Sequence, residues 1–508
     1  MKFYTTTPLY YVNDKPHLGT AYATCMAATM NEFRKLIGFE TLFLTGIDEH
    51  GQKIQQTAER RKVTPQEHCD EFATNYIQTW KDLEINYDIF YRTTDPKHKK
   101  AVQILLQKLF DQGDIYEQNY EGWYCVSDET FYPEDDLVDG KSPTGKPVEK
   151  VSEKNYFFKM SKYQKQLIQH IESHPDFLQP ESKRNEVLGF LSKPLEDLSI
   201  SRPKSRIHWG IPIPFDDQHV TYVWVDALSN YAIAVGLFSE DDSDKKIFDT
   251  WWNKATVQHI IGKDILVTHA VYWCTILMAL KIKVPDQIFA TGWILNKDSG
   301  KMSKSVGEVL DPLQVVKDVG LESFKYYIAS EIRFGNDAPF SQDLVIQKIN
   351  SDLANTLGNL LSRSTNLIEK FYSGQIPEGN NDISELKTTG LNLFKKVKQS
   401  ILDNEPHMAC SEVIGYLKTV NQFVENKAPW KMAKENPAEA AIVLRDTLEA
   451  LRISAILLSP ILKTKMNSLF QSLNYNFDLK DAEQECQNWY GLKTGSKINK
   501  PEPLFPRI

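Results

Sequence analysis

Two short motifs contain residues whose types and spacing suit phosphate chemistry. Pro16 to Thr20 reads Pro-His-Leu-Gly-Thr, and Lys301 to Ser305 reads Lys-Met-Ser-Lys-Ser. The first motif lies where a loop is predicted to become a helix, and the free N–H groups at a helix start favour an anion. The two lysines of the second motif follow a predicted flexible turn, so they can close on a polyphosphate and neutralise charge during attack at phosphorus. We therefore expect both segments to converge on one triphosphate, with a plain surface turn as the alternative for each motif alone.

A carboxylate follows the second predicted strand. That strand is predicted over Thr41 to Thr45, and Gly46 to Gly51 follows it directly as Gly-Ile-Asp-Glu-His-Gly. Ligands bind at the carboxyl edge of a parallel sheet, where the carboxylate of Asp48 suits an ammonium group. A helix-capping aspartate is the alternative interpretation.

Two aromatic-rich stretches are candidates for an apolar pocket. They run from Val223 to Tyr231 and from Gly262 to Trp273. Four residues of the second stretch are predicted to share one helix face or adjacent faces: Thr268, His269, Tyr272 and Trp273. Because thioether sulfur contacts ring edges favourably, these stretches predict a pocket for an apolar, polarisable side chain. Packing within an ordinary aromatic core is the alternative.

The composition is that of an ordinary globular protein. The 508 residues are 41% hydrophobic and 25% charged, so we expect several domains and a large core, with no membrane span and no signal peptide. The net charge of −8 means that a nucleic acid must meet a local basic patch, for which Arg60 to Lys62, Lys97 to Lys100 and Lys204 to Arg206 are candidates. The six cysteines lack metal-ligand or redox spacing, which predicts free thiols and a cytoplasmic location.

The predicted elements place the motifs on an α/β sheet. A strand over residues 2–7, a helix over 18–37 ended by Gly38, and the strand over 41–45 form a βαβ unit. The same pattern recurs as a strand over 256–261, a helix over 264–280 and a strand over 287–292. These units suit the two halves of one doubly wound parallel sheet.

The character of the chain changes between the halves and again after them. Turns, charges and aromatic residues from 115 to 206 predict an inserted domain. After residue 343 the apolar period of 3.6 predicts a helical bundle, with helices over 386–402, 408–426 and 437–458. The predicted domains are 1–114 and 221–342 for the two halves of the sheet domain, 115–220 for the insertion, and 343–508 for the helical domain.

Six segments together resemble the methionyl-tRNA synthetase family, which belongs to the first class of aminoacyl-tRNA synthetases. They occur in the family's order and extend over nearly the whole chain. The resemblance implies a Rossmann-like, doubly wound catalytic domain split by a connective insertion, followed by an α-helical anticodon-binding bundle. The segments are Thr6–Tyr11 with His17, Gly46–Gly51, Trp224–Ala227, Gly262–Asp264, Lys301–Ser305 and Ala428–Trp430.

The resemblance implies a reaction in two steps and a set of site residues. ATP, accompanied by Mg²⁺, would activate L-methionine to methionyl-adenylate, and the methionyl group would pass to the terminal adenosine of methionine tRNA. Asp48 would take the methionine ammonium group, and the rings of Trp224 and Trp273 would close on its thioether. The implied catalytic residues are His17, Thr20, Lys301 and Lys304; the other ATP-binding residues are Gly19, Gly262, Asp264, Trp293 and Ile294. The implied methionine-binding residues are Leu9, Tyr11, Asp48, Trp224, Ala227, Leu228, Tyr231, Ile265 and His269; the anticodon readers are Asn359, Arg363 and Trp430.

Local spacing agrees in part with the anticodon assignment. Asn355, Asn359 and Arg363 stand four residues apart and would form one polar stripe on an α-helix. Trp430 follows Pro429 at a predicted helix end, where an exposed ring can stack on an unpaired base. The alternative is a solvated helix face beside a buried tryptophan.

The sequence departs from the family pattern at three points. Thr20 stands where the motif usually has a second histidine, although a hydroxyl can still donate to a phosphate. Only Cys125 remains of four zinc-binding cysteines found in many relatives, since Asp128, Ser142 and Gly145 occupy the other expected positions; we therefore predict no zinc. The segment before Ile508 is similar to the end of the family's shorter form, which predicts a monomer.

Several other functions are compatible with parts of the sequence. The nearest is another class I synthetase, specific for valine, isoleucine, leucine or cysteine, although the insertion is small for an editing domain and the metal ligands of a cysteine enzyme are missing. A nucleotidyltransferase that never meets tRNA would not need residues 343–508. A tRNA-binding protein without catalysis is disfavoured by Lys301 and Lys304 and mildly favoured by Thr20.

Overall fold

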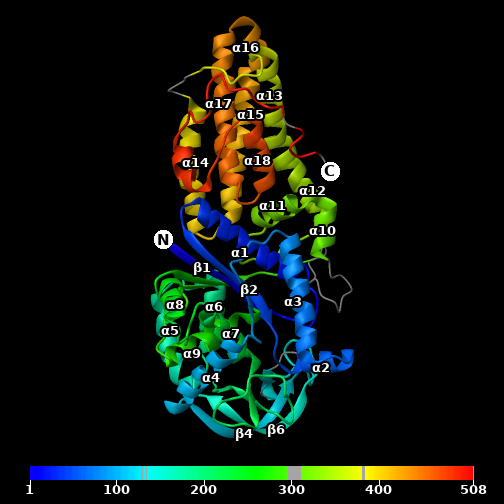
Figure 1. Cartoon of the computed structure of the whole chain (residues 1–508), viewed down its shortest axis with the longest axis vertical. Helices are drawn as coiled ribbons and strands as arrows, with labels where there is room; N and C mark the ends of the chain where they lie inside the picture. The colour runs from blue at the N-terminus through cyan, green and yellow to red at the C-terminus, as the bar shows by residue number, and fades with distance from the viewer. Residues whose placement is uncertain (127–129, 133, 296–310, 380–383, 501, 507–508) are drawn as a thin grey trace. The chain divides into compact units, whose positions relative to one another are not determined.

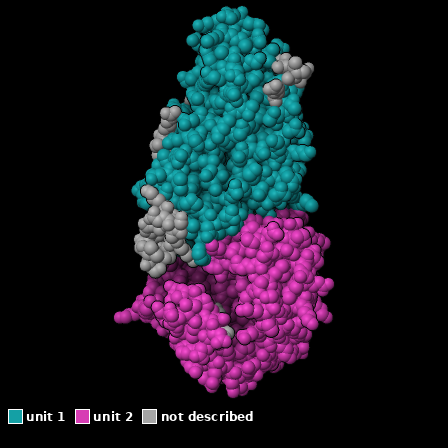
Figure 2. Space-filling model, turned by 180° about the vertical axis from the view of Figure 1, so that it is seen from behind, with its two compact units in different colours: residues 1, 17–41, 292–508 teal, residues 2–16, 42–291 magenta. Residues whose placement is uncertain are grey.

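The computed structural model describes residues 1–508 except 127–129, 133, 296–310, 380–383, 501 and 507–508. These residues form two compact units, coloured separately in Figure 2. The first, which we call the sheet unit, comprises residues 2–16 and 42–291. The second, the helical unit, comprises residue 1, residues 17–41 and residues 292–508. The domain boundaries predicted from the sequence, at residues 114, 220 and 342, stay a prediction.

The sheet unit is built around a six-stranded sheet. Its strand order is β3-β2-β1-β11-β12-β7. The pairs β2–β3, β1–β11, β11–β12 and β12–β7 are parallel. The predicted α/β fold is thereby confirmed, with the two half-sheets joined between β1 and β11. The strands are β1 (Lys2–Tyr11), β2 (Glu40–Asp48), β3 (Ile89–Arg92), β7 (Leu178–Gln179), β11 (Thr256–Gly262) and β12 (Gln287–Thr291).

The central strands are buried although they contain polar residues. In β1, Thr5, Thr6 and Thr7 are completely buried, and the hydroxyl of Thr7 donates to that of Thr45 on β2 at 2.8 Å. β-Branched threonines suit a strand, and each buried hydroxyl needs a partner. Strand β2 runs three residues beyond the predicted Thr45, so Gly46 to Asp48 lie inside the strand. A Cβ at Gly46 would come within 2.1 Å of the Tyr91 carbonyl oxygen on β3, so the close approach of these strands requires glycine.

Helices of the sheet unit begin at well-formed caps. Thr64 and Glu67 form a reciprocal capping box at the start of α3 (Pro65–Asp82), and Asp95 caps α4 (Pro96–Asp111). Helix α7 (Val223–Ile233) packs against α4 and against the π-helical turn Thr268–Trp273. The remaining helices of this unit are α2 (Gln52–Arg61), α5 (Gln164–Ser173), α6 (Glu181–Leu191), α8 (Asp242–Phe248) and α9 (Cys274–Ala279).

The inserted segment forms its own antiparallel sheet, of order β5-β4-β6-β8. The long hairpin pairs β4 with β6 over ten residues of each strand, from Ile115 opposite Phe158 to Tyr124 opposite Glu149. The same segment also supplies β7 to the edge of the parallel sheet, which the sequence did not predict. The strands are β4 (Ile115–Cys125), β5 (Thr130–Tyr132), β6 (Glu149–Phe158) and β8 (Leu198–Ser199); β9 (Ser201–Pro203) and β10 (His219–Thr221) form a separate pair.

The helix predicted over residues 264–280 is interrupted. A 3-10 turn over Lys263–Ile265 is followed, after two α-helical residues, by the π-helical turn Thr268–Trp273 and then by the short α-helix Cys274–Ala279. A π-turn changes the direction in which side chains point, and such turns occur frequently at functional sites. The prediction of one regular helix was therefore wrong in geometry, although the segment is helical throughout most of its length.

The helical unit contains α1 and a bundle. Helix α1 (Leu18–Leu36) matches the predicted helix within one residue and packs on α11 and α14, and Arg34 NH2 donates to the side-chain oxygen of Asn404 at 3.1 Å. Figure 1 shows α13, α14, α15, α17 and α18 side by side, with α16 at one end. The further elements are α10 (Pro312–Val319), α11 (Leu321–Glu331), α12 (Gln342–Lys348), α13 (Asn359–Tyr372), α14 (Glu385–Leu402), α15 (Pro406–Lys427), α16 (Pro429–Glu435), α17 (Pro437–Leu458), α18 (Lys463–Ser472), α19 (Ala482–Gln487), β13 (Ile294–Leu295) and β14 (Ala338–Pro339).

The buried central helix α17 holds the C-terminal segment through charged groups. Glu449 is completely buried, accepts from Arg452 Nε at 2.7 Å and forms an ion pair with Arg445 NH2 at 2.9 Å. The other Glu449 contact comes from the backbone N–H of Leu492 at 3.0 Å, and Arg452 donates to the carbonyl of Glu485 at 3.0 Å. Buried charges must be paired and hydrogen-bonded, so this network fixes where the last residues dock. Among the described residues, no helix has the length and apolar character needed to cross a membrane.

Candidate functional site

The carboxyl ends of the central strands bring together the predicted methionine-binding residues. Leu9 and Tyr11 end β1, Asp48 ends β2, and Gly262 ends β11. The chain order reverses between β1 and β11, and ligands bind at such a switch point of a parallel sheet. All nine predicted residues belong to the sheet unit.

Helix α7 presents four of these residues as one stripe. Trp224, Ala227, Leu228 and Tyr231 are spaced i, i+3, i+4 and i+7, so they lie on one face of the helix. Ala227, Leu228 and Tyr231 are buried, whereas Trp224 is half-buried, like Leu9, Tyr11 and Ile265 from the neighbouring elements. The group therefore combines a buried base with a partly exposed rim, as a binding pocket requires.

A buried tyrosine–histidine pair lies at the base of this group. The Tyr231 hydroxyl is 2.8 Å from Nε2 of His269, and Nδ1 of His269 is 2.8 Å from the carbonyl oxygen of Ile265. Burial lowers the pKa of His269 to about 4, so the ring is neutral at pH 7. The Ile265 carbonyl can only accept, so the single ring proton lies on Nδ1 and Tyr231 donates to Nε2. The pair thus offers a bound ligand a polarisable, uncharged surface.

A second buried histidine lies behind the first. His259 on β11 contacts the hydroxyl of Thr6 through Nδ1 at 2.8 Å, and Nε1 of Trp273 donates to its Nε2 at 3.3 Å. Burial lowers the pKa of His259 well below its usual value, so this ring is also neutral. Trp273 is completely buried, with its ring 6.5 Å from that of Tyr231, so it packs behind the predicted methionine-binding residues. Trp224 instead meets His269 edge-on, with ring centres 6.4 Å apart.

The acidic residue assigned to the ammonium group is buried at the end of β2. Asp48 is 5% exposed. Burial, and then the nearby hydroxyl of Tyr10, raise the pKa of Tyr231; a hydrogen bond with Asn230 opposes them, and the carboxylate of Asp48 adds a still smaller increase. Asp48 ends β2, the strand next to β1 that carries Leu9 and Tyr11, so its position lies at the same edge of the sheet as those two residues.

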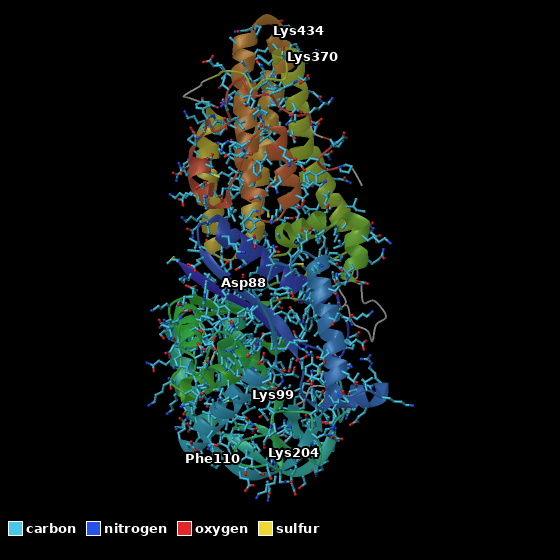
Figure 3. All side chains as sticks on the ribbon, viewed as in Figure 1. Asp88, Lys99, Phe110, Lys204, Lys370 and Lys434 are labelled. Atoms are coloured by element: carbon cyan, nitrogen blue, oxygen red, sulfur yellow. The ribbon has the colours of Figure 1, made fainter. Side chains whose placement is uncertain are left out.

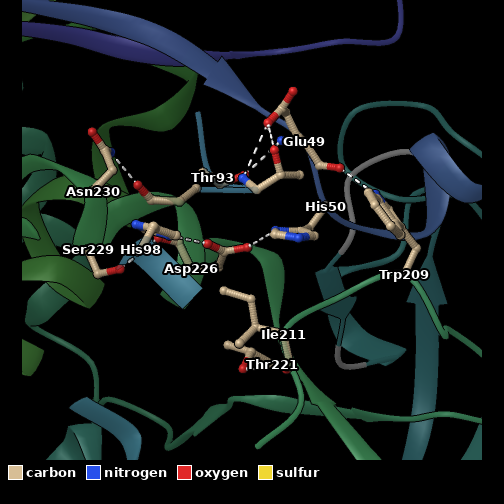
Figure 4. Close-up of polar contacts among 12 residues, drawn as sticks. Glu49, His50, Thr93, His98, Trp209, Ile211, Thr221, Asp226, Ser229 and Asn230 are labelled. Carbon is tan, nitrogen blue, oxygen red and sulfur yellow. Dashed lines mark hydrogen bonds and ion pairs between the residues drawn. The ribbon is translucent and has the colours of Figure 1, made fainter. Parts of the chain in front are cut away.

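Glu49, which the sequence reasoning passed over, supports the same edge. Its side chain is completely buried and accepts from Arg92 Nε at 2.9 Å and from the Thr94 hydroxyl at 2.5 Å. Its carbonyl accepts from Nε1 of Trp209 at 2.5 Å, and its N–H donates to the Thr93 hydroxyl at 3.0 Å (Figure 4). These contacts hold the chain directly after Asp48. The signal that could have identified Glu49 in the sequence is its position as an acidic residue between Asp48 and His50.

At the start of α1, in the helical unit, the residues of the first motif form a reciprocal cap. Nδ1 of His17 accepts from the N–H groups of Gly19 at 3.1 Å and Thr20 at 3.4 Å, while the Thr20 hydroxyl accepts from the His17 N–H at 3.0 Å. An accepting Nδ1 carries no proton, so the ring proton lies on Nε2. A Cβ at Gly19 would come within 3.1 Å of the His17 ring, so the folded-back ring would have to move slightly if glycine were replaced. Thr20, the departure from the family pattern, completes this capping box.

The other predicted nucleotide-binding positions are divided between the two units. In the sheet unit, Gly262 precedes a 3-10 turn, and a Cβ there would come within 2.7 Å of the Asp264 carboxylate. In the helical unit, the Trp293 N–H donates to Asp337 at 2.8 Å and its carbonyl accepts from Ala338 at 3.0 Å. Ile294 lies in β13, opposite Ala338. Lys301 and Lys304 lie outside the described residues.

The positions where relatives would hold zinc contain a tight turn. The Ser142 hydroxyl contacts that of Thr144 at 2.9 Å and accepts from the Lys146 N–H at 3.2 Å, while Gly145 N–H donates to the Ser142 carbonyl at 2.7 Å. Cys125 is buried, and Asp128 lies outside the described residues. Within the described part of the chain, no group of three or more His, Cys, Asp or Glu side chains is placed to hold a metal ion. The absence of zinc stays a prediction.

Two of the three predicted anticodon readers, Arg363 and Trp430, are in contact. The guanidinium of Arg363 on α13 lies 4.2 Å from the ring centre of Trp430 on α16, and its NH2 pairs with Glu425 at 2.8 Å. Asn359 is exposed at the start of α13. Asn355 falls in a π-helical turn, Ile349–Gly358, so the predicted stripe does not continue back to Asn355 on one regular α-helix. Trp430 is half-buried, so its ring is neither a core residue nor fully exposed.

The basic patches proposed from the sequence are partly neutralised. Arg61 pairs with Glu71 at 2.5 Å, Lys97 with Asp244 at 3.6 Å, and Arg206 with Glu153 at 3.1 Å. By contrast, Lys370 and Lys434 are exposed at the end of the bundle where α16 lies (Figure 3). The six cysteines are buried and free, as predicted.

Comparisons with known proteins agree with this geometry. The family described as "tRNA synthetases class I (M)" matches residues 3–150 and 135–365, and the "Anticodon binding domain of methionyl tRNA ligase" matches residues 378–508. The methionine–tRNA ligase of Clostridium acetobutylicum is 44% identical over 514 residues, covering 100% of this chain and 78% of that protein. That of Nostoc sp. is 41% identical, covering 100% of this chain and 97% of that protein.

A solved structure extends the match to three dimensions. The methionyl-tRNA synthetase of Mycobacterium tuberculosis, in complex with methionyl-adenylate, superposes with a TM-score of 0.92 at 34% identity, covering 100% of both chains. Two family matches and relatives along the full length thus agree with the parallel sheet and the helical bundle. The chain belongs to the methionyl-tRNA synthetase family of class I aminoacyl-tRNA synthetases.

Proposed function

We propose that this protein activates L-methionine with ATP and transfers it to methionine tRNA. In the first step a methionine carboxylate oxygen attacks the α-phosphorus, the bond from that phosphorus to the bridging oxygen breaks, and pyrophosphate leaves. In the second step the 2′- or 3′-hydroxyl of the terminal adenosine attacks the methionyl carbonyl carbon and loses its proton, and AMP leaves. Family membership supports both steps.

The observation that carries the choice of methionine is the neutral Tyr231–His269 pair. A charged base would favour a polar side chain, whereas an uncharged, polarisable surface beside the Trp224 ring suits a thioether. Asp48, buried at the end of β2, supplies the charge that an amino-acid ammonium group needs. One methylene alone distinguishes substrates by only about 1–3 kcal/mol, so the sulfur contacts are required for specificity. Leu9, Tyr11, Ala227, Leu228 and Ile265 complete the proposed pocket.

Triphosphate binding is assigned to the two motifs. His17 donates from Nε2, and Thr20, whose hydroxyl donates to the His17 carbonyl at 2.7 Å, holds that residue in place. Lys301 and Lys304 neutralise charge that develops on the leaving pyrophosphate. Magnesium accompanies ATP as part of the substrate. The capping box supports the role of His17, because it fixes which ring nitrogen carries the proton. Gly19, Gly262, Asp264, Trp293 and Ile294 are assigned to the nucleotide.

Anticodon reading is assigned to Asn359, Arg363 and Trp430. A half-buried tryptophan at a helix start can stack on an unpaired base, and the guanidinium already on its face marks the ring as a stacking platform. The exposed Lys370 and Lys434 at the same end supply positive charge for the phosphates.

We further propose a monomeric, cytoplasmic enzyme without structural zinc. Free, buried cysteines support a reducing compartment. The turn built on Ser142 supports an insertion stabilised by hydrogen bonds and packing. Sedimentation equilibrium tests the oligomeric state, and metal analysis of the purified protein tests the zinc prediction; one tightly bound zinc per chain would contradict it.

Exchange of labelled pyrophosphate into ATP tests the proposed activity. Methionine alone should support exchange. Exchange with leucine, isoleucine, valine or cysteine in place of methionine would overturn the specificity, and exchange without any amino acid would favour a plain nucleotidyltransferase. Tight tRNA binding without exchange would identify a protein that binds tRNA but does not activate an amino acid.

Substitution of the second lysine tests its assigned role. Lys304→Ala should slow exchange by about 100- to 1,000-fold, the usual effect of removing one group that stabilises developing charge. Methionine binding, followed by tryptophan fluorescence, should change little. Lys317→Ala, an exposed lysine on α10, is the matched control and should leave exchange intact. An equal loss of binding and exchange in Lys304→Ala would show that the lysine has another role.

A further inference from the structure

A buried carboxylate outside the assigned site residues accepts hydrogen bonds from two histidines. Oδ2 of Asp226 lies 2.6 Å from Nδ1 of His50, and Oδ1 lies 2.6 Å from Nε2 of His98 (Figure 4). The three side chains are each 3% exposed or less. Burial by itself would raise the pKa of Asp226, but the two histidine contacts outweigh burial and lower it to about 2. The carboxylate is therefore ionised, and each histidine donates to it.

Each histidine also has a second attachment. The His50 carbonyl accepts from the hydroxyl of Tyr11 at 2.9 Å, and the Tyr91 hydroxyl is 3.3 Å from Nδ1 of His98. The His50 ring lies 5.5 Å from the ring of Trp209. Asp226 thus links α7 to the ends of β1 and β2 through His50, and to β3 and α4 through His98.

The position of Asp226 on α7 relates this cluster to the pocket. At 100° per residue, Asp226 lies on the side of the helix opposite the stripe formed by Trp224, Ala227, Leu228 and Tyr231. It also lies in the first turn of α7, where the helix dipole favours a negative charge. His50 stands two residues after Asp48 and holds the hydroxyl of Tyr11. The cluster therefore joins the three elements that carry most of the proposed methionine pocket.

Stability alone is a weak reason for such a cluster. Buried ionic groups generally stabilise a fold no better than apolar side chains of the same size, because removing charges from water is costly. Two directional hydrogen bonds, however, fix both the rotation of α7 about its axis and its position relative to β2. Small displacements of that kind matter at binding sites, where groups must be held within about 0.5 Å.

We propose that Asp226, held by His50 and His98, is a positioning residue for methionine. It touches neither substrate in this assignment. It acts by setting the α7 stripe against Asp48 and Tyr11, so that the thioether pocket and the ammonium site are aligned for one molecule. This inference rests on the proposed function, because it assumes that methionine occupies the pocket.

The first experiment replaces the carboxylate without changing its size. Asp226→Asn should raise the KM for methionine by about tenfold or more in pyrophosphate exchange, because a hydrogen bond to a charged group is lost and an amide N–H faces a histidine donor. The KM for ATP should change by less than about twofold, since ATP binding is assigned to other residues. Asp114→Asn is the matched control. Asp114 is also a buried carboxylate of the sheet unit, bonded to Lys162 at 2.6 Å and to Tyr163 at 2.6 Å, and its variant should lower stability without changing the KM for methionine.

The second experiment separates positioning from bulk. Gln reproduces the Nε2 donor that His98 uses, and Asn reproduces the Nδ1 donor that His50 uses. His98→Gln and His50→Asn should therefore keep the KM for methionine within about threefold of wild type, whereas His98→Leu and His50→Leu should raise it by about tenfold. Because these variants keep the Asp226 carboxylate, they remain informative if Asp226→Asn does not fold.

The outcomes distinguish the inference from the proposed function. If wild type shows methionine-dependent exchange but the Leu and donor-keeping variants have the same KM for methionine, the positioning role is wrong and the function stands. If the KM values for methionine and ATP rise together, the cluster is only a structural support and the inference is also wrong. If wild type shows no methionine-dependent exchange, the proposed function fails, and the inference fails with it.

Discussion

The proposed methionine pocket and the proposed anticodon-reading end of the bundle would recognise their ligands by opposite means. In the pocket, His259 and His269 are buried and kept neutral, and the only charge assigned to the ligand is Asp48. At the bundle end, a half-buried ring carries a guanidinium 4.2 Å from its centre, and exposed lysines lie nearby (Figure 3). Specificity for a small apolar side chain requires a dry, rigid surface, whereas a nucleic acid is attracted by charge and read by stacking.

The difference predicts that substitutions in the two regions impair different activities. Perturbing the pocket should affect methionine activation and leave tRNA binding intact, and perturbing the bundle end should do the reverse. Salt should act on one region and not on the other. The same reasoning predicts that pH near neutrality acts weakly on the pocket, because its histidines do not titrate there.

The largest separation is expected at Trp430. Trp430→Ala removes the stacking surface, so kcat/KM for tRNA charging should fall by about 10- to 100-fold, which corresponds to the loss of one base–aromatic stack. Pyrophosphate exchange with methionine should not change. Trp430→Phe, which keeps a ring, should recover most of the charging activity. Parallel losses of exchange and charging in Trp430→Ala would show that the ring is a structural residue of the bundle.

Ionic strength should produce a smaller but still clear separation. If two lysines such as Lys370 and Lys434 neutralise phosphates, raising salt from about 50 to 200 mM should weaken tRNA binding by about tenfold. The KM for methionine should change by less than about twofold, because the pocket is buried and screening acts poorly there. The measurement is the slope of log KM against log salt for each substrate.

Lysine substitutions sharpen the salt experiment. Lys370→Ala combined with Lys434→Ala should flatten the slope for tRNA. Lys396→Ala is the matched control, because Lys396 lies in the same unit but pairs with Glu412 at 2.9 Å, so its removal should leave the slope unchanged. An unchanged slope in the double variant would place the phosphate contacts elsewhere on the protein.

The local elements could be predicted from the sequence because local physics determines them. Helix α1 ends within one residue of its predicted limit, since Gly38 adopts a positive φ of 88° directly after it. Strands β11 and β12 were also located closely, because buried parallel strands are short apolar runs. The helix over 264–280 was only partly right, because hydrophobic period does not reveal a π-turn.

The buried polar contacts could not be predicted, because they join residues far apart in the chain. Asp226 meets His50 and His98, and Thr6 meets His259, only after the sheet has formed. Likewise, Thr20 could be named as a departure from the family pattern, but its reciprocal bonds with His17 required coordinates. Motif resemblance therefore indicated where ligand-facing residues stand, and the structure added the residues that hold them.

A modest effect is expected when the Tyr231 hydroxyl is removed. Tyr231→Phe leaves Nε2 of His269 without its donor, and the loss of one neutral hydrogen bond should raise the KM for methionine by about fivefold. tRNA binding should not change. Tyr327→Phe, which removes a hydroxyl that donates to the Pro339 carbonyl at 3.1 Å in the helical unit, is the matched control. A methionine KM that is unchanged in Tyr231→Phe would show that the pair does not shape the ligand surface.

The smallest expected effect is that of pH near neutrality on methionine binding. The pKa of His269 is about 4 in the folded protein against an ordinary value of 6.5, so the unfolded chain takes up a proton first as pH falls. The contribution of the neutral His269 ring to the free energy of unfolding should accordingly be fully present above about pH 6.5. It should decline by up to about 3 kcal/mol as the pH falls towards 4. Between pH 6 and 8 the KM for methionine should vary by less than about twofold, after correction for the ionisation of methionine itself. Histidine NMR signals followed through pH 5–8 provide the direct measurement. A His269 resonance that titrates near pH 6.5 would mean that the ring is solvated. The proposed pocket would then not be the dry, uncharged surface on which methionine selectivity depends.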